Sequence, residues 1–272
     1  MQIFKPSEKY TDLSLTTHLA VGAHQDDIEF GMYHGILQCY RSEKNFFTGV
    51  TLTDGAGSPR AGIYADYTDE QMKEIRVIEQ NNAASVGQYL AQYQLGYTSD
   101  QVRDRENVKL IDDLVNIIET TRPKIIYTHN LADKHSTHVA VGLRVIEALR
   151  KCRYKPEEIY GCEGWRSLDW LPDSQKIRLN VSGRLNLESA LLGIFDSQIS
   201  GGKKYDSATV GRRLSNATYG DSHAVDSAKS VSLAMNLMPL INDINLDISE
   251  YVTMYINEFS NEVQSMLKDL LC

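Results

Sequence analysis

The 272-residue chain predicts an α/β fold with a largely parallel sheet and helices on both faces. Short apolar runs that suit buried strands alternate with longer segments whose apolar residues recur at helical spacing. A chain of this length can bury a sizeable core. We expect a single domain over 1–272, in which 1–160 form the core of the sheet and 161–272 form a smaller C-terminal elaboration.

Strands and helices alternate through the first part of the chain. The predicted strands are short and rich in β-branched or aromatic residues, at 19–23, 46–53, 95–98, 124–128 and 158–161. The predicted helices carry apolar residues on one face, at 29–41, 68–93, 104–121 and 136–151. Glycine and proline indicate a loop after the second strand, at 54–59. This succession predicts consecutive βα units.

The pattern becomes less regular after Trp165. A strand is expected at 176–181, a helix at 184–196, and a Gly-, Lys- and Ser-rich loop at 200–211. The tail, 248–271, predicts an amphipathic helix whose apolar side carries Tyr251, Val252, Tyr255, Ile256 and Phe259. Such a stripe indicates core packing or contact with another copy, so a homo-oligomer is one expectation.

Composition and charge narrow the class of protein. The net charge of −8 argues against nucleic acid or an anionic membrane surface as the main partner. No stretch approaches 18 apolar residues, and the first residues lack the apolar core of a signal peptide. The four cysteines, Cys39, Cys152, Cys162 and Cys272, have no paired spacing, which favours reduced thiols. We therefore expect a cytoplasmic protein.

Three ionisable residues follow the first buried strand. His24, Asp26 and Asp27 occupy four positions directly after 19–23. Their desolvation is costly unless something binds them. The carboxyl edge of an open α/β sheet is where ligands bind, so we expect a metal site there with a spare carboxylate beside it.

A second polar cluster follows the strand at 124–128. It contains His129, Asp133, His135 and His138, and a helix beginning near 136 would place His135 and His138 close together. Two imidazoles and a carboxylate with one open position are the ligand set of catalytic zinc, although Fe²⁺ or Mn²⁺ also accept it. The alternative is that these side chains cap helices and satisfy buried backbone groups.

These motifs resemble those of the PIG-L/LmbE-like N-acetylglucosaminyl deacetylase family. Residues 23–29, Ala-His-Gln-Asp-Asp-Ile-Glu, are similar to its AHPDD[x]E motif, and 133–138, Asp-Lys-His-Ser-Thr-His, are similar to its DxHxDH motif. Residues 53–57 lie where the family has a TxGExG-like loop, and 76–84 resemble its RxxE…A helix. The ordered matches span about 19–145.

The resemblance implies a Rossmann-like fold and a metal-dependent amidohydrolase that removes acetyl from a small N-acylated substrate, such as an N-acetylated amino sugar. His24, Asp27 and His138 would then hold the metal, and Asp26 would be the general base. A protonated His135 would donate to the developing oxyanion or to the leaving amine.

Candidate substrate residues lie in three further segments. The resemblance assigns Arg76 to substrate hydroxyls or phosphate, and Asp54 lies in the family's loop region. Trp165 and Arg166 follow a predicted strand, where an aromatic face and a guanidinium suit a sugar ring.

The chain departs from the family pattern at Gln25, Ser136 and Thr137, the last two of which stand where Pro-Asp is common. Gln25 replaces a proline, which loosens the predicted turn, and Thr137 stands where an acid is usual. These departures leave two alternatives open: a carbohydrate-binding or regulatory protein without turnover, and a metal-dependent hydrolase of a non-sugar amide.

Overall fold

A mixed eight-stranded sheet runs through the computed structural model, which describes residues 1–220 and 225–271. The strands are β1 (Gln2–Phe4), β2 (His18–Gly22), β3 (Phe47–Thr53), β4 (Ala91–Tyr97), β5 (Ile125–His129), β6 (Glu158–Cys162), β7 (Lys176–Asn180) and β8 (Val231–Asn236). Their order is β1-β4-β3-β2-β5-β6-β8-β7. The central pairs β4–β3, β3–β2, β2–β5 and β5–β6 are parallel, and the outer pairs are antiparallel. The predicted fold class is confirmed.

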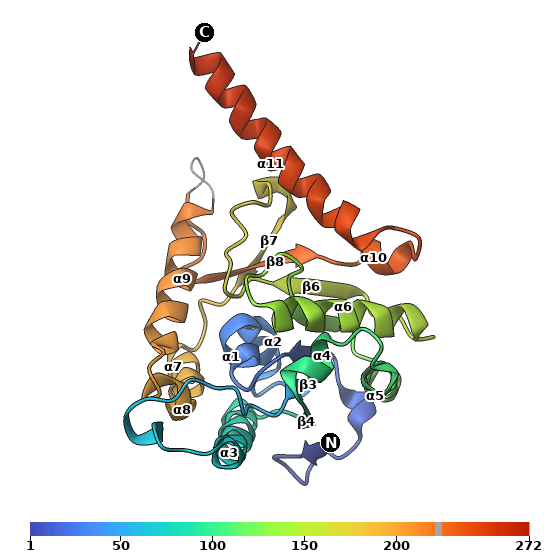
Figure 1. Ribbon diagram of the computed structural model, residues 1–272, viewed down its shortest axis with the longest axis vertical. Helices are drawn as coiled ribbons and strands as arrows, with labels where there is room; N and C mark the ends of the chain where they lie inside the picture. The colour runs from blue at the N-terminus through green and yellow to red at the C-terminus, as the bar shows by residue number, and fades with distance from the viewer. Residues whose placement is uncertain (221–224, 272) are drawn as a thin grey trace.

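Helices cover both faces of the sheet (Figure 1). They are α1 (Asp27–Gly31), α2 (Tyr33–Cys39), α3 (Asp69–Gly87), α4 (Ser99–Arg103), α5 (Val108–Thr121), α6 (Ser136–Lys151), α7 (Leu185–Gly193), α8 (Asp196–Ile199), α9 (Tyr205–Tyr219), α10 (Pro239–Asn242) and α11 (Ile248–Leu271). Leu19 and Val21 of β2 pack in a core with α5 and α6, whereas Ala20 packs in a second core with α1, α2 and α7. The alternation along one strand thus supplies both cores.

The third helix ends earlier than the predicted 68–93. Thr68 caps its start with a capping box, and Gln88 ends it with a left-handed backbone at φ 55°. The chain then turns back, and Leu90 N–H donates to the carbonyl of Phe47 at 2.7 Å. Pairing with β3 therefore recruits residues 91–97 into β4, where the sequence predicted a strand only at 95–98.

The predicted helix 104–121 begins later, as α5 (Val108–Thr121), and a separate short helix, α4 (Ser99–Arg103), precedes it. Thr98 caps α4 and Asn107 caps α5 through side-chain oxygens. Asp104 between them has an extended backbone, with φ −69° and ψ 111°. Local capping therefore breaks the predicted segment at its start.

The C-terminal part differs most from the expectation. The predicted loop at 200–211 is wrong, because α9 begins at Tyr205 and continues to Tyr219. The sequence pattern did not reveal β8, which pairs antiparallel with both β6 and β7. The second half of the chain therefore extends the same sheet and places α9 beside it.

The last helix leaves the body of the molecule (Figure 1). Tyr251 and Val252 in its first turn are buried, and Tyr251 donates to the carbonyl of Asn236 at 2.7 Å. Beyond them the apolar side remains accessible, with Phe259 38% and Met266 58% exposed. Within the described residues, no helix combines the length and apolar composition that crossing a bilayer requires. Cys39, Cys152 and Cys162 are buried, and Cys272 lies outside the described residues.

Candidate active site

The carboxyl ends of four neighbouring strands form one cavity of about 680 Å³. The segments after β2, β3, β5 and β6 contribute His24, Asp54, His138 and Trp165 to its lining. In a parallel sheet these ends meet at one edge, where the helices that follow begin. The fold thus assembles the two polar clusters that lie more than 100 residues apart in the chain.

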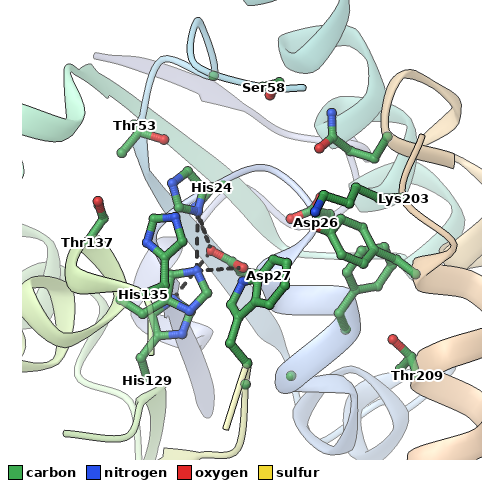
Figure 2. A pocket seen from close by; sticks show the side chains of 18 of the residues that line it. His24, Asp26, Asp27, Thr53, Ser58, His129, His135, Thr137, Lys203 and Thr209 are labelled. Atoms are coloured by element: carbon green, nitrogen blue, oxygen red, sulfur yellow. Dashed lines mark hydrogen bonds and ion pairs between the residues drawn. The ribbon is translucent and has the colours of Figure 1, made fainter. Parts of the chain in front are cut away.

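His24 and Asp27 lie next to each other (Figure 2), and His138 offers a third ligand atom beside them. Asp27 Oδ2 lies 3.1 Å from His24 Nδ1, and Asp27 Oδ1 lies 3.3 Å from His138 Nε2. His24 Nδ1 and His138 Nε2 are 3.3 Å apart. One donor atom from each residue lies within 4.8 Å of the other two. Two imidazole nitrogens and one carboxylate are a ligand set that suits Zn²⁺.

Local hydrogen bonds orient these donors. Asp27 begins α1 and accepts the backbone N–H of His24 at 2.6 Å. His138 lies in the first turn of α6, and its Nδ1 is 3.3 Å from Asp133 Oδ2. Asp133 also accepts the backbone N–H of His135 at 3.1 Å. A carboxylate behind a ligating imidazole fixes its orientation, so Asp133 supplies the acid that Thr137 lacks.

His129 lies beside this set but faces the backbone. Its Nε2 accepts the N–H of Ala23 at 3.0 Å and lies 3.4 Å from Asp27 Oδ2. His129, Asp133 and His138 also form a geometrically possible triad. Because the Nε2 of His129 already accepts the N–H of Ala23, the triad of His24, Asp27 and His138 is the stronger candidate for holding a metal ion.

Asp27 and the surrounding imidazoles shift each other's pKa values. Burial would raise the pKa of Asp27, but the imidazoles of His138, His129 and His24 outweigh it and hold the pKa well below its usual range. Burial opposes the charge on His138, yet Asp27 and Asp133 raise its pKa to about 10. Asp27 is therefore ionised and His138 protonated in the absence of a metal, and a bound metal ion would displace that proton and take its place beside the carboxylate. The residues therefore fit a divalent metal.

Asp26 is held next to this centre in a strained conformation. Its φ of 104° is rare for a residue other than glycine. Arg76 Nη2 lies 3.1 Å from its carboxylate, and Gln80 Oε1 accepts its N–H at 3.3 Å. Burial raises the pKa of Asp26 to about 6, although Arg76 opposes the shift. A carboxyl group with a pKa in this range suits proton transfer near neutral pH.

Protein groups surround the guanidinium of Arg76, for which the resemblance predicted a contact with substrate. It lines the cavity, but only 1% of its side chain is exposed. Its guanidinium also donates to the carbonyl of Gln25 and lies 3.3 Å from Glu79. Glu79 in turn accepts the N–H and hydroxyl of Ser197 at 2.7 and 2.6 Å. Arg76 therefore positions Asp26 and ties the C-terminal part of the chain to it.

The turn around Gln25 is restrained despite the missing proline. Gln25 is 1% exposed, and its Nε2 donates to the carbonyl of Thr53 at 3.0 Å. This side-chain hydrogen bond joins the end of β2 to the end of β3. The expected loosening of the turn is therefore wrong.

His135 stands at the mouth of the cluster. It precedes the first turn of α6, and its ring stacks on His138 with a centroid distance of 4.6 Å. Burial, together with His138 and His24, lowers the pKa of His135 to about 4. The imidazole is then neutral near pH 7, in contrast to the protonated form expected from the sequence.

The remaining predicted substrate residues separate into two groups. Asp54 and Trp165 line the cavity, and Trp165 is 41% exposed. Arg166 is not among the lining residues, because its Nε donates to the carbonyl of Ala132 at 2.9 Å on the surface. The structure thus brings Trp165 to the cavity and turns its neighbour away.

The opposite wall comes from a segment that the sequence predicted as loop. Lys203 precedes α9, and Tyr205, Thr209 and Arg212 follow it along that helix. The spacing of the last three, i, i+4 and i+7, places them on one helical face. That spacing was visible in the sequence, but the Gly/Lys-rich start of the segment obscured it.

Comparisons with known proteins agree with this arrangement. Residues 19–149 match the model of the PIG-L family, described as GlcNAc-PI de-N-acetylase. A comparison with curated protein sequences found no match to the chain.

Solved structures with the same fold differ widely in sequence. The conserved protein TT1542 from Thermus thermophilus is 17% identical with a TM-score of 0.65, and the match covers 85% of this chain and 99% of that one. The 4-carboxy-2-hydroxymuconate hydratase GalB from Pseudomonas putida is 16% identical with a TM-score of 0.62, and the match covers 85% of this chain and 100% of that one. The N,N'-diacetylchitobiose deacetylase from Pyrococcus horikoshii is 14% identical with a TM-score of 0.64, and the match covers 86% of this chain and 88% of that one. This fold therefore occurs in both a deacetylase and a hydratase, so the reaction has to be inferred from the residues of the site and not from the fold.

Proposed function

We propose that this chain, whose residues 19–149 form a PIG-L family domain, is a metal-dependent deacetylase. Its substrate would be an N-acetylated amino sugar or a related small conjugate, cleaved by water to acetate and an amine. The observation that carries the proposal is the convergence of His24, Asp27 and His138, with Asp26 next to them. The deacetylase among the proteins of similar fold supports the same reaction class.

His24, Asp27 and His138 would hold the metal, and their two nitrogens and one carboxylate suit Zn²⁺ and also accept Fe²⁺ or Mn²⁺. When bound, such a cation acidifies water and polarises a carbonyl oxygen. Asp133 would keep the imidazole of His138 oriented toward it.

Asp26 would act as the general base and then as the general acid. It takes a proton from the attacking water as the new C–O bond forms at the acetyl carbon. It then gives this proton to the nitrogen as the C–N bond breaks. The contact with Arg76 keeps the carboxylate in place for both transfers, and the pKa of about 6 suits both.

His135 would stabilise the negative charge that develops on the acetyl oxygen. Since its pKa is lowered to about 4, we assign this role to an N–H of the neutral imidazole. A donor aimed at an oxyanion is typically worth about 2.7–4 kcal/mol. Trp165 and Asp54 would contact the sugar ring and its hydroxyls from the cavity wall.

The proposal is tested by metal analysis together with acetate release from a panel of N-acetylated sugars and non-sugar amides. We expect about one metal per chain and release that a chelator abolishes. Asp26→Asn should lower kcat by about 10²–10⁴-fold with metal retained, and His138→Ala should lose the metal. Lys124→Gln, at the opposite end of β5, is the matched surface control.

The outcomes separate the alternatives. Unchanged activity in both Asp26→Asn and His138→Ala would refute the mechanism. Metal binding and sugar binding without acetate release would indicate a carbohydrate-binding protein instead. Release only from non-sugar amides would retain the chemistry and reject the amino sugar.

A further inference from the structure

The cavity holds more basic side chains than its acids neutralise. Five line it: Arg76, Arg103, Lys203, Arg212 and Arg213. Three of these pair with carboxylates: Arg76 with Asp26 and Glu79, Arg103 with Asp100, and Arg213 with Glu188. Among residues 1–220 and 225–271, neither Lys203 nor Arg212 has a carboxylate within 4.0 Å.

Lys203 points into the cavity from the segment before α9, toward Asp26 (Figure 2). Its ammonium lies 5.1 Å from the ring centroid of Trp165. Tyr205 packs against the same indole, with ring centroids 5.9 Å apart. The aromatic face restricts where the ammonium can lie without neutralising it. Lys203 is therefore a positioned cation next to the proposed substrate residue Trp165.

Arg212 reaches the cavity from two turns further along α9. Its Nη1 donates to the carbonyl of Gly164, which holds the guanidinium against the segment that follows β6. A guanidinium has five N–H donors, so this contact leaves others for a ligand. Thr209, on the same face of the helix, adds a hydroxyl to the wall.

The acidic side chains of the cavity form contacts with groups other than Lys203 and Arg212. Asp26 is paired with Arg76, and Asp27 lies among the imidazoles of the metal centre. Glu163 accepts the side chain of Asn216 at 2.6 Å and the N–H of Leu233 at 2.9 Å, so it joins α9 to β8. Burial raises the pKa of Glu163, and the nearby guanidinium groups of Arg212 and Arg213 oppose this shift. Asp54, the fourth acid of the lining, lies 3.4 Å from Lys73. In the part of the chain that the structure describes, none of these four acids lies within 4.0 Å of Lys203 or Arg212.

We infer that the substrate carries an anionic group, a carboxylate or a phosphate ester, which Lys203 and Arg212 bind while the N-acetyl group lies at Asp26. This inference rests on the proposed function for the position of the acetyl group. A cation in a partly enclosed cavity attracts an anion far more strongly than the same cation in water does. The two side chains thus determine specificity on the wall opposite the metal.

The experiment measures binding apart from turnover. Calorimetry with the metal-loaded protein compares glucosamine, glucosamine 6-phosphate and muramic acid, which carry no anionic group, a phosphate and a carboxylate. We expect at least one of the charged sugars to bind about ten-fold or more tightly than glucosamine, since a hydrogen-bonded ion pair contributes this much. Comparing the two charged sugars identifies the anion.

Variants test whether Lys203 and Arg212 cause the preference for the charged sugar. Lys203→Gln should reduce the preference for the charged sugar to about one, and Arg212→Gln should reduce it in part. Lys124→Gln makes the same change of charge at the far end of β5 and should keep the wild-type preference. Equal binding of all three sugars by the wild type, or an undiminished preference in Lys203→Gln, would overturn the inference.

Turnover distinguishes this inference from the proposed function. A preference for the charged sugar that depends on Lys203, without acetate release from any N-acetylated form, would support the anion site and reject the deacetylase. Acetate release with equal kcat/KM for charged and neutral substrates would support the deacetylase and reject the anion site.

Discussion

Asp133→Asn tests whether the carboxylate behind His138 supports the metal centre. Asp133 Oδ2 faces His138 Nδ1 at 3.3 Å and accepts the N–H of Trp165 at 3.1 Å, and Oδ1 accepts the N–H of His135 at 3.1 Å. An asparagine has only one acceptor oxygen. Its amide group would therefore face either the His138 ring or the His135 N–H. The substitution also removes the charge that helps to raise the pKa of His138.

The expected effect follows from these contacts. Loss of a carboxylate behind a ligating histidine typically weakens metal binding by 10–100-fold, or about 1.4–2.7 kcal/mol. We therefore expect the Zn²⁺ dissociation constant of Asp133→Asn to rise by about 10–100-fold. The free energy of unfolding of the metal-free protein should fall by only about 1–2 kcal/mol, since the other backbone contacts persist.

Competition with a chromophoric chelator measures the Zn²⁺ affinity, and urea unfolding of the metal-free protein measures stability. Asp54→Asn is the matched control. It also removes one carboxylate charge, but Asp54 pairs with Lys73 at 3.4 Å and not with a metal-binding histidine. A dissociation constant for Asp133→Asn within about three-fold of wild type would refute the role of Asp133.

Three further predictions concern stability and assembly. Glu188→Gln leaves the buried guanidinium of Arg213 without its carboxylate and should lower the free energy of unfolding, measured by urea titration, by about 3 kcal/mol. The double variant with Arg213→Met should regain most of this stability. Equal stability of wild type and Glu188→Gln would contradict the prediction. Burial lowers the pKa values of His18 and His34 from 6.5 to about 4, so both stay neutral in the folded protein above pH 6.5. Stability should then fall by up to about 3 kcal/mol per histidine as the pH decreases from about 6.5 to 4, because the unfolded chain takes up these protons first; urea midpoints that do not change over this range would exclude it. If the exposed side of α11 joins two copies, Phe259→Glu should reduce the mass measured by light scattering to that of one chain; a wild type that is already monomeric would reject the homo-oligomer.

The sequence predicted the central βα units well because each depends on local information. Buried strands such as β2 and β5 appear as short apolar runs, and α6 begins and ends where its amphipathic pattern does. Errors arose where pairing partners are distant. β8 pairs with β6 and β7, and no local sequence pattern predicts these pairings. α3 ends at Gln88, which has a left-handed backbone, because the residues that follow pair with β3 as part of β4.

The sequence by itself determined which side chains could hold a metal. His24 and Asp27 follow one parallel strand and His138 follows its neighbour, and the ends of adjacent parallel strands must meet at one edge. Only the tertiary structure decided what those side chains do there. The contact of Arg76 with Asp26, the carboxylate of Asp133 behind His138, and the position of Lys203 on the opposite wall all join segments through packing. Direction and burial of a side chain depend on these distant neighbours, and burial in turn determines the pKa and the free hydrogen-bonding groups on which the chemistry depends.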